Sequence, residues 1–152
     1  MANKGGQVNR QYIKPTKFYS HAVSTSGTGK LVHVSGQVSW DADGKVVGAG
    51  DMRAQSEQVF RNVTDVLRAA GASWGDVIKM NAYMVGVTPE NVASYREVRM
   101  RFLKPGKLPA STLVGVTALV QPELLLEVEC VAAVGGGAAK KPAAKKAKKK
   151  RR

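Results

Sequence analysis

The chain has 152 residues, with 24 Lys and Arg against 11 Asp and Glu and a formal net charge of +13. Residues 140–152 hold nine basic residues and no acid, residues 1–17 hold four basic residues and no acid, and the stretch between them is electrically neutral. The sequence therefore describes an ordinary globular domain with basic ends, which excludes a uniformly charged protein that coats nucleic acid.

Cysteine and histidine are scarce. Cys130 is the one cysteine and cannot form an intramolecular disulfide, and with His21 and His33 it offers too few ligands for a closed zinc site. No apolar run reaches the roughly 18 residues of a membrane span, and the N-terminus lacks the apolar centre of a signal peptide. We expect a cytoplasmic protein without a membrane span, metal or cofactor.

The first half of the chain predicts two strands and a helix. Residues 17–23 and 30–35 are rich in β-branched and aromatic residues, and the Ser/Thr/Gly segment between them predicts a β-hairpin. Residues 41–44, Asp-Ala-Asp-Gly, predict a second turn. A helix should begin after Asp51 as N-cap and end at Gly71, because apolar residues between them recur at helical spacing.

The second half continues with alternating elements. Residues 78–85 alternate apolar and polar side chains as a strand does. Thr88 and Pro89 then open a helix whose inner face holds Val92, Tyr95, either Val98 or Arg99, and Phe102. Residues 112–119 and 124–134 complete a β-β-α-β-α-β-β order, which is typical of an α+β fold with a mixed sheet and two helices on one face.

The other face of this sheet also needs cover. Leu113 or Leu119, Leu125 and Val131 are expected to be on that face, where a lone protomer would leave apolar sheet in water. We therefore predict an oligomer built sheet against sheet. The domain organisation is a leader at 1–16, a folded domain at 17–134 and a disordered basic tail at 135–152.

Three segments together resemble the Rid family of reactive-intermediate deaminases, also called YjgF-like and described as endoribonuclease L-PSP. They are Val-Ser-Gly-Gln at 34–37, Gly-Ala-Ser-Trp-Gly-Asp-Val-Ile-Lys at 71–79, and Leu-Pro-Ala-Ser-Thr-Leu-Val-Gly-Val at 108–116 with Leu-Glu-Val-Glu at 126–129. The resemblance implies a chorismate-mutase-like α+β protomer and a homotrimer with a barrel-like core. It also implies a ligand cleft between each pair of protomers.

The resemblance further implies a set of substrate-binding positions. Family deaminases carry an arginine after the Pro-Ala pair that grips the substrate carboxylate, but this chain has Ser111 there and is closer to the subgroups that lack the arginine. A charge-assisted contact of about 1.5–3 kcal/mol is thereby lost. Arg96 and Arg99 on the second helix are candidates to return a cation to the cleft.

Three other cleft positions are carried over from the family. Tyr19 matches a tyrosine of the cleft wall, Gly36 matches the backbone of the Ser-Gly-Gln turn, and Glu127 matches the glutamate that holds the attacking water. A carboxylate that holds water suits general-base attack on a C=N carbon. Glu127 is therefore the candidate catalytic residue.

Ordinary structural roles compete with these assignments. Glu127 and Glu129 share one strand face and are either an acid/base pair or solvated charges. A nucleophilic Ser111 has little support, because no histidine is close in sequence. Cys130 alternates with apolar residues and indicates core packing, and Trp74 and Tyr83 are interpreted as structural residues.

The C-terminal tail is unlike the family and resembles the Lys/Ala/Pro tails of linker-histone-like proteins. Such tails bind phosphate backbones through counterion release. A solubilising role, attachment to RNA or an anionic membrane, and a nuclear import signal stay open, so the protein could be nucleoid-associated, or nuclear in a eukaryote. The nucleic-acid-binding candidates are Lys140, Lys141, Lys145, Lys146, Lys148, Lys149, Lys150, Arg151 and Arg152.

Two functions of different class remain, and the residues leave open whether the chain is an enzyme. The first is a trimeric hydrolase that releases ammonia from small reactive imines or enamines, with a tail that binds nucleic acid. The second is a non-catalytic scaffold or small-molecule-binding protein that its tails tether to DNA or RNA. A nuclease has less support, because the sequence offers no paired histidines or acidic metal cluster.

Overall fold

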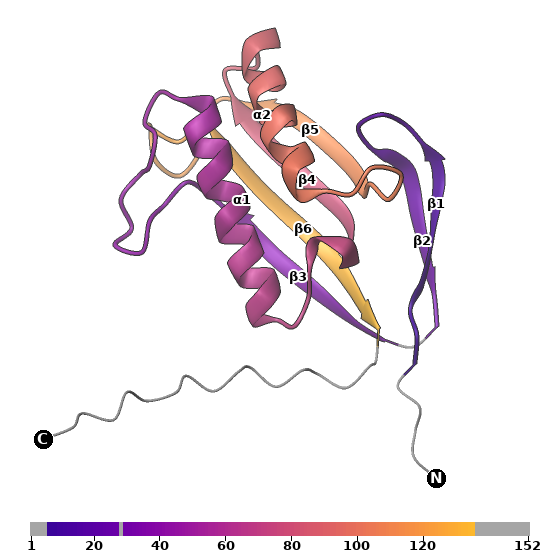
Figure 1. The fold of residues 1–152 in the computed structure, drawn as a ribbon. Helices are drawn as coiled ribbons and strands as arrows, with labels where there is room; N and C mark the ends of the chain where they lie inside the picture. Colours follow the sequence, from indigo (N-terminus) through magenta and orange to yellow (C-terminus); the bar gives the residue numbers. More distant parts are fainter. Residues whose placement is uncertain (1–5, 28, 136–152) are drawn as a thin grey trace, which may run out of the picture.

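The computed structural model describes residues 6–27 and 29–135, and these form a mixed sheet with two α-helices (Figure 1). The helices are α1 (Met52–Ala69) and α2 (Pro89–Phe102), with a short 3-10 helix η1 (Trp74–Asp76) after α1. The strands are β1 (Asn9–Pro15), β2 (Ser20–Ser26), β3 (Gly29–Gln37), β4 (Val77–Val85), β5 (Ala110–Val116) and β6 (Leu126–Gly135).

Both helices begin at the capping residues that the sequence indicated. The Asp51 side chain accepts hydrogen bonds from the backbone N–H groups of Arg53 and Ala54, at 2.9 and 3.1 Å. The Thr88 hydroxyl accepts one from the N–H of Asn91 at 3.2 Å, ahead of a helix that opens with proline. These side chains satisfy N–H groups that have no partner inside the helix. The two helix predictions are confirmed.

The predicted hairpin between the first two strands is wrong. The sheet order is β1-β2-β5-β4-β6-β3, so β2 pairs with β1 while β3 lies at the far edge beside β6. Gly27 has φ of +98°, and a Cβ there would collide with the carbonyl of Gln7. The Ser/Thr/Gly segment therefore redirects the chain to another part of the sheet instead of folding it back on itself.

Strand β1 lies within the segment that we assigned to a leader. Residues 9–15 pair antiparallel with β2 along its length, and the Arg10 guanidinium donates to Asp76 at 2.7 Å and to the carbonyl of Ala133. The leader has few apolar residues and gave no strand signal of its own. Its pairing with β2 supplies the backbone partners that a strand needs.

The helices cover one face of the sheet, where the core lies (Figure 1). Met80, Ala82 and Met84 of β4 are fully buried there with the inner sides of both helices. Phe60 of α1 stacks on Trp74 with ring centroids 5.2 Å apart, which confirms a structural role for Trp74. No helix in the described part of the chain is long and apolar enough to cross a membrane.

The second face of the sheet carries both polar and apolar side chains, so the sequence-based expectation is only partly wrong. Leu113 and Leu125 pack against the helix-side core and do not form an apolar surface on the other side. Strand β4 turns the alternate residues Lys79, Asn81 and Tyr83 to that other face.

Apolar side chains also remain on this second face. Val131 pairs with Lys79 and is there, as predicted, and Leu31 and Val114 are 59% and 43% exposed. The argument for an oligomer from uncovered apolar sheet therefore rests on fewer residues than expected, and the site has to add to it.

Candidate functional site

Four of the predicted site residues line one pocket of about 360 Å³ on the helix side of the sheet. Tyr19 comes from the turn before β2, Arg96 and Arg99 from α2, and Ser111 from β5. The remaining wall is formed by the side chains of Phe18, Val92, Tyr95 and Leu113. The structure thus brings together residues that are up to 92 positions apart in the chain, as the numbers of Tyr19 and Ser111 show.

The turn that carries Tyr19 is held by hydrogen bonds to its own residues and to the start of β5. The Thr16 hydroxyl donates to the carbonyl of Tyr19 at 2.8 Å, and the Ser20 hydroxyl donates to the carbonyl of Leu108 at 2.7 Å. Ser20 also pairs with Ala110, the residue before Ser111. These contacts keep Tyr19 beside Ser111, with about a third of its surface (37%) left exposed.

Arg99 is almost completely buried, with 2% of its surface exposed. Its Nη1 donates to the carbonyl of Phe18, and its Nε lies 3.3 Å from the sulfur of Met80. Its Nη2 has no hydrogen-bond partner among the described residues. Burial lowers the pKa of Arg99, since the charged form loses water that the protein does not replace.

Tyr95 lies one turn before Arg99 on the same helix and is also buried. Its hydroxyl has no hydrogen-bond partner within the described part of the chain. Burial raises the pKa of Tyr95 to about 12, although the charges of Arg99 and Arg96 act in the opposite direction. The phenol is therefore neutral and keeps its proton for donation at physiological pH.

The other two predicted residues, Gly36 and Glu127, form a second group. A Cβ at Gly36 would collide with the carboxylate of Glu127, so glycine is what allows this side chain to lie against β3. A register irregularity between Val34 and Gln37 bends β3 at this point. The Ser-Gly-Gln segment is thus part of strand β3 and not a turn, and Gly36 and Glu127 are in direct contact.

Substituting Gly36 with alanine is expected to displace the Glu127 carboxylate without unfolding the protein, because the clash is with the end of a flexible side chain. If Glu127 is catalytic, the rate of any Glu127-dependent reaction should fall about tenfold or more, as misplacement of a catalytic group commonly does. The melting temperature should change little. Unchanged activity in this variant would mean that the position of Glu127 does not matter.

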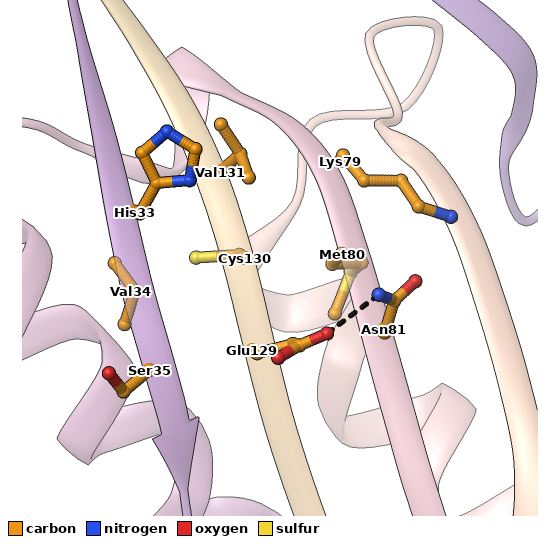
Figure 2. Close-up of a pocket in the computed structure, with 9 residues that line it drawn as sticks. All are labelled: His33, Val34, Ser35, Lys79, Met80, Asn81, Glu129, Cys130 and Val131. Atoms are coloured by element: carbon orange, nitrogen blue, oxygen red, sulfur yellow. Dashed lines mark hydrogen bonds between the residues drawn. The ribbon is translucent and has the colours of Figure 1, made fainter.

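Glu129 lies on the same sheet face as Glu127, as predicted, and lines a cavity of about 310 Å³ with both polar and apolar walls (Figure 2). Asn81 Nδ2 and the Tyr83 hydroxyl both donate to its Oε1 at 2.8 Å. The bonds from Asn81 and then Tyr83 lower the pKa of Glu129. Glu129 is therefore a fixed, ionised acceptor and unlike a proton-transferring partner of Glu127. His33 and Lys79 also line this cavity.

The two groups of predicted residues face opposite sides of the sheet. Ser111 is in register with Met80, which points to the helices. Glu127 is in register with Tyr83, which points to the face opposite the helices. In a strand, side chains on the same side of the sheet are two residues apart. Within one protomer the sheet therefore separates Glu127 from the pocket that holds Ser111 and Tyr19.

Two nucleophile hypotheses find no support in this geometry. Neither His21 nor His33 is among the residues that line the pocket around Ser111. Cys130 is buried, and burial raises its pKa to about 12, which leaves the thiol protonated. The described residues contain no group of three or more His, Cys, Asp or Glu side chains that could hold a metal ion.

Comparisons with known proteins show which family the chain belongs to. The family described as endoribonuclease L-PSP matches residues 9–134, from the start of β1 to nearly the end of β6. The chain belongs to this family. It is 31% identical to a RutC family protein of Pyrococcus abyssi over 119 residues, which are 78% of this chain and 88% of that protein. A mitochondrial protein of Saccharomyces cerevisiae is 32% identical over 114 residues, 75% of this chain and 73% of that one.

Solved structures give the same family. A Rid family protein from Yersinia pestis has a TM-score of 0.77 and 38% identity, covering 83% of this chain and 99% of that one. RidA from an Antarctic Psychrobacter has a TM-score of 0.62 and 32% identity, covering 76% and 88% of the two chains. The predicted Rid (YjgF-like) membership and α+β fold are confirmed.

Two features of the site were missed in the sequence: the hydrogen bond from Asn81 to Glu129 and the buried hydroxyl of Tyr95. Asn81 and Lys79 were seen only as the polar side of an alternating strand. Nothing in that pattern predicts that Asn81 donates a hydrogen bond to Glu129 on the adjacent strand β6. Tyr95 was placed on the inner side of a helix as a core residue, and its partnerless hydroxyl has no sequence signal. The predicted nucleic-acid-binding residues 140–152 lie outside the described residues.

Proposed function

We propose that this protein hydrolyses small reactive imines or enamines with release of ammonia, in clefts formed between protomers. The observation that carries the proposal is the division of the site: Glu127 with Gly36 on one face, and the pocket of Tyr19 and Ser111 on the other. Two half-sites on opposite faces of a sheet form complete sites when the Glu127 face of one copy packs head to tail against the pocket of the next copy around a closed ring. A homotrimer satisfies this requirement.

The chemistry assigned to these residues is the addition of water to a C=N bond. The Glu127 carboxylate accepts a proton from water, whose oxygen attacks the imine carbon as the C=N electron pair moves to nitrogen. The proton held by Glu127 passes to that nitrogen, which gives a carbinolamine. Glu127 then accepts the proton of the carbinolamine hydroxyl and delivers it to the nitrogen, so the C–N bond breaks as the C=O bond forms. A ketone and ammonia leave, so one imine and one water are consumed for each turnover. An enamine enters the same path after it tautomerises to the imine.

The shared site predicts that two inactive variants restore each other. Glu127→Gln removes the base, and Ser111→Trp fills the pocket, so each variant alone is expected to lack activity. In a ring where each site takes one half from each of two neighbours, randomly mixed subunits should regain about a quarter of the wild-type rate. Co-expression, purification and an ammonia assay measure this.

The mass of the assembly provides the control for this experiment. Light scattering should give three times the 16.2 kDa mass of the chain for the wild type and for both variants. If the mixed trimers form but stay inactive, each site lies within a single protomer, and the proposed cleft is wrong. A monomeric wild type would also contradict it.

A second candidate function is a non-catalytic scaffold that binds a small molecule and is tethered to DNA or RNA by its tails. Ser111 supports this alternative, because the charged contact of the family's deaminases is missing at that position. The nine basic residues in 140–152 support the tether, since Lys and Arg side chains bind phosphate backbones without reading the bases. A cytoplasmic location, whether or not the protein associates with the nucleoid, stays a prediction.

A further inference from the structure

The arginines of the described residues differ in their partners, and the difference points to the pocket. All but two of the arginines in residues 6–27 and 29–135 form ion pairs with a carboxylate; these are Arg10, Arg53, Arg61, Arg68 and Arg101. The two exceptions, Arg96 and Arg99, both line the pocket that holds Ser111. None of the eight residues that line this pocket is acidic.

Arg99 requires a partner more than Arg96 does. Arg96 is exposed and stacks on the ring of Phe18, with its guanidinium carbon 4.6 Å from the ring centroid, so water solvates its charge. Arg99 is buried and cannot lose its proton at neutral pH, and within residues 6–27 and 29–135 its guanidinium hydrogen-bonds only to a carbonyl and to sulfur atoms. A buried charge without a counter-ion is strongly destabilising.

The partnerless groups are both hydrogen-bond donors. Nη2 of Arg99 and the hydroxyl of Tyr95 are on adjacent turns of α2, and both side chains line the same pocket. Buried polar groups in proteins are nearly always hydrogen-bonded, and those that are not call for an explanation. One charged and one neutral donor can together bind the two oxygens of a carboxylate.

We propose that Arg99 and Tyr95 bind the carboxylate of a small monoanionic ligand in this pocket, and so supply from α2 the contact that Ser111 does not. Of the two arginines that line the pocket only Arg99 is buried, and its guanidinium balances one negative charge, while Arg96 is exposed and stacked on Phe18. A phosphate dianion would bring a second charge against the apolar side chains of Val92 and Leu113. Small rotations of the pocket side chains would have to open a path to the two donors. The choice of ligand class rests on the proposed function, but the binding itself does not.

The test is the binding of pyruvate to the full-length protein, measured by ligand-observed NMR, with uncharged pyruvamide as the matched probe. Arg99→Met keeps the length and apolar packing of the side chain and removes the charge, and it should weaken pyruvate binding about 10- to 100-fold. Tyr95→Phe should weaken it about fivefold. Arg101→Met, which removes an exposed, ion-paired arginine of the same helix, should leave the affinity unchanged.

Thermal unfolding separates a binding role from a structural one. Tyr95→Phe removes a hydroxyl that has no partner in the described structure, so the melting temperature without ligand should stay the same or rise. A hydroxyl that only supported the fold would lower it when removed. Arg99→Lys, which keeps the charge, should recover part of the pyruvate affinity and thereby exclude simple misfolding of Arg99→Met.

The inference and the proposed hydrolysis can fail separately. Wild-type protein that does not bind pyruvate, binds pyruvamide equally well, or loses nothing in Arg99→Met overturns the inference. Arg99-dependent binding of pyruvate without ammonia release supports the inference and removes the hydrolase proposal. Ammonia release that depends on Glu127 but not on Arg99 supports the hydrolase proposal and removes the inference.

Discussion

Replacing Glu127 with glutamine is expected to remove the acceleration of ammonia release from 2-iminopropionate, with a loss of about 10²- to 10⁴-fold in rate. Glutamine keeps the shape that fits against Gly36 but cannot accept a proton from water. The imine is generated in the assay by an amino-acid oxidase, and ammonia and the keto acid are followed together. The rate without protein gives the background hydrolysis.

Glu129→Gln is the matched control for this variant. Glu129 lies two residues further along the same strand and the same face, but its Oε1 already accepts hydrogen bonds from Asn81 and Tyr83. It is therefore expected to retain most of the activity. If Glu129→Gln is the inactive variant and Glu127→Gln is active, the proposed base is wrong. If the wild type itself gives only the background rate, the scaffold function becomes the better one.

The elements of the fold that depend on residues close together in the sequence could be predicted from it. Asp51 and Thr88 are helix caps, and the alternation of residues 78–85 is local, so α1, α2 and β4 were found. The pairing of β3 with β6 joins residues about a hundred positions apart, and no local pattern distinguishes it from a hairpin with β2. The wrong hairpin arose for this reason.

The site was only partly predictable, for a related reason. Resemblance to the Rid family supplied Tyr19 and Glu127, but the register of β5 and β6 on β4 decides that they serve opposite faces. For the inner side of α2 the helical period left Val98 and Arg99 as alternatives, and the structure buries both. Burial of a charged side chain goes against ordinary residue preference, so such a position is not found by pattern alone.

Deleting residues 136–152 is expected to abolish tight binding to duplex DNA. Nine basic residues follow position 139, and proteins that make about 6–10 phosphate contacts lose about 10³- to 10⁵-fold in affinity between 50 and 200 mM salt. The full-length protein should therefore bind DNA with a steep salt dependence, and the shortened protein should not. Fluorescence anisotropy of a labelled duplex over a series of salt concentrations measures both.

A tail with the same residues in shuffled order is the informative control, because counterion release depends on charge and hardly on sequence. The shuffled tail should bind like the natural one, while a tail with its basic residues replaced by glutamine should not bind. A large loss on shuffling would instead indicate a specific partner that reads the sequence. The stretch between residues 17 and 140 carries as many acids as bases. Residues 1–17, which the shortened protein keeps, add four basic residues and no acid. A steep salt dependence that survived the deletion would therefore come from these residues or from an asymmetric charge distribution on the folded domain, and the tether would be wrong.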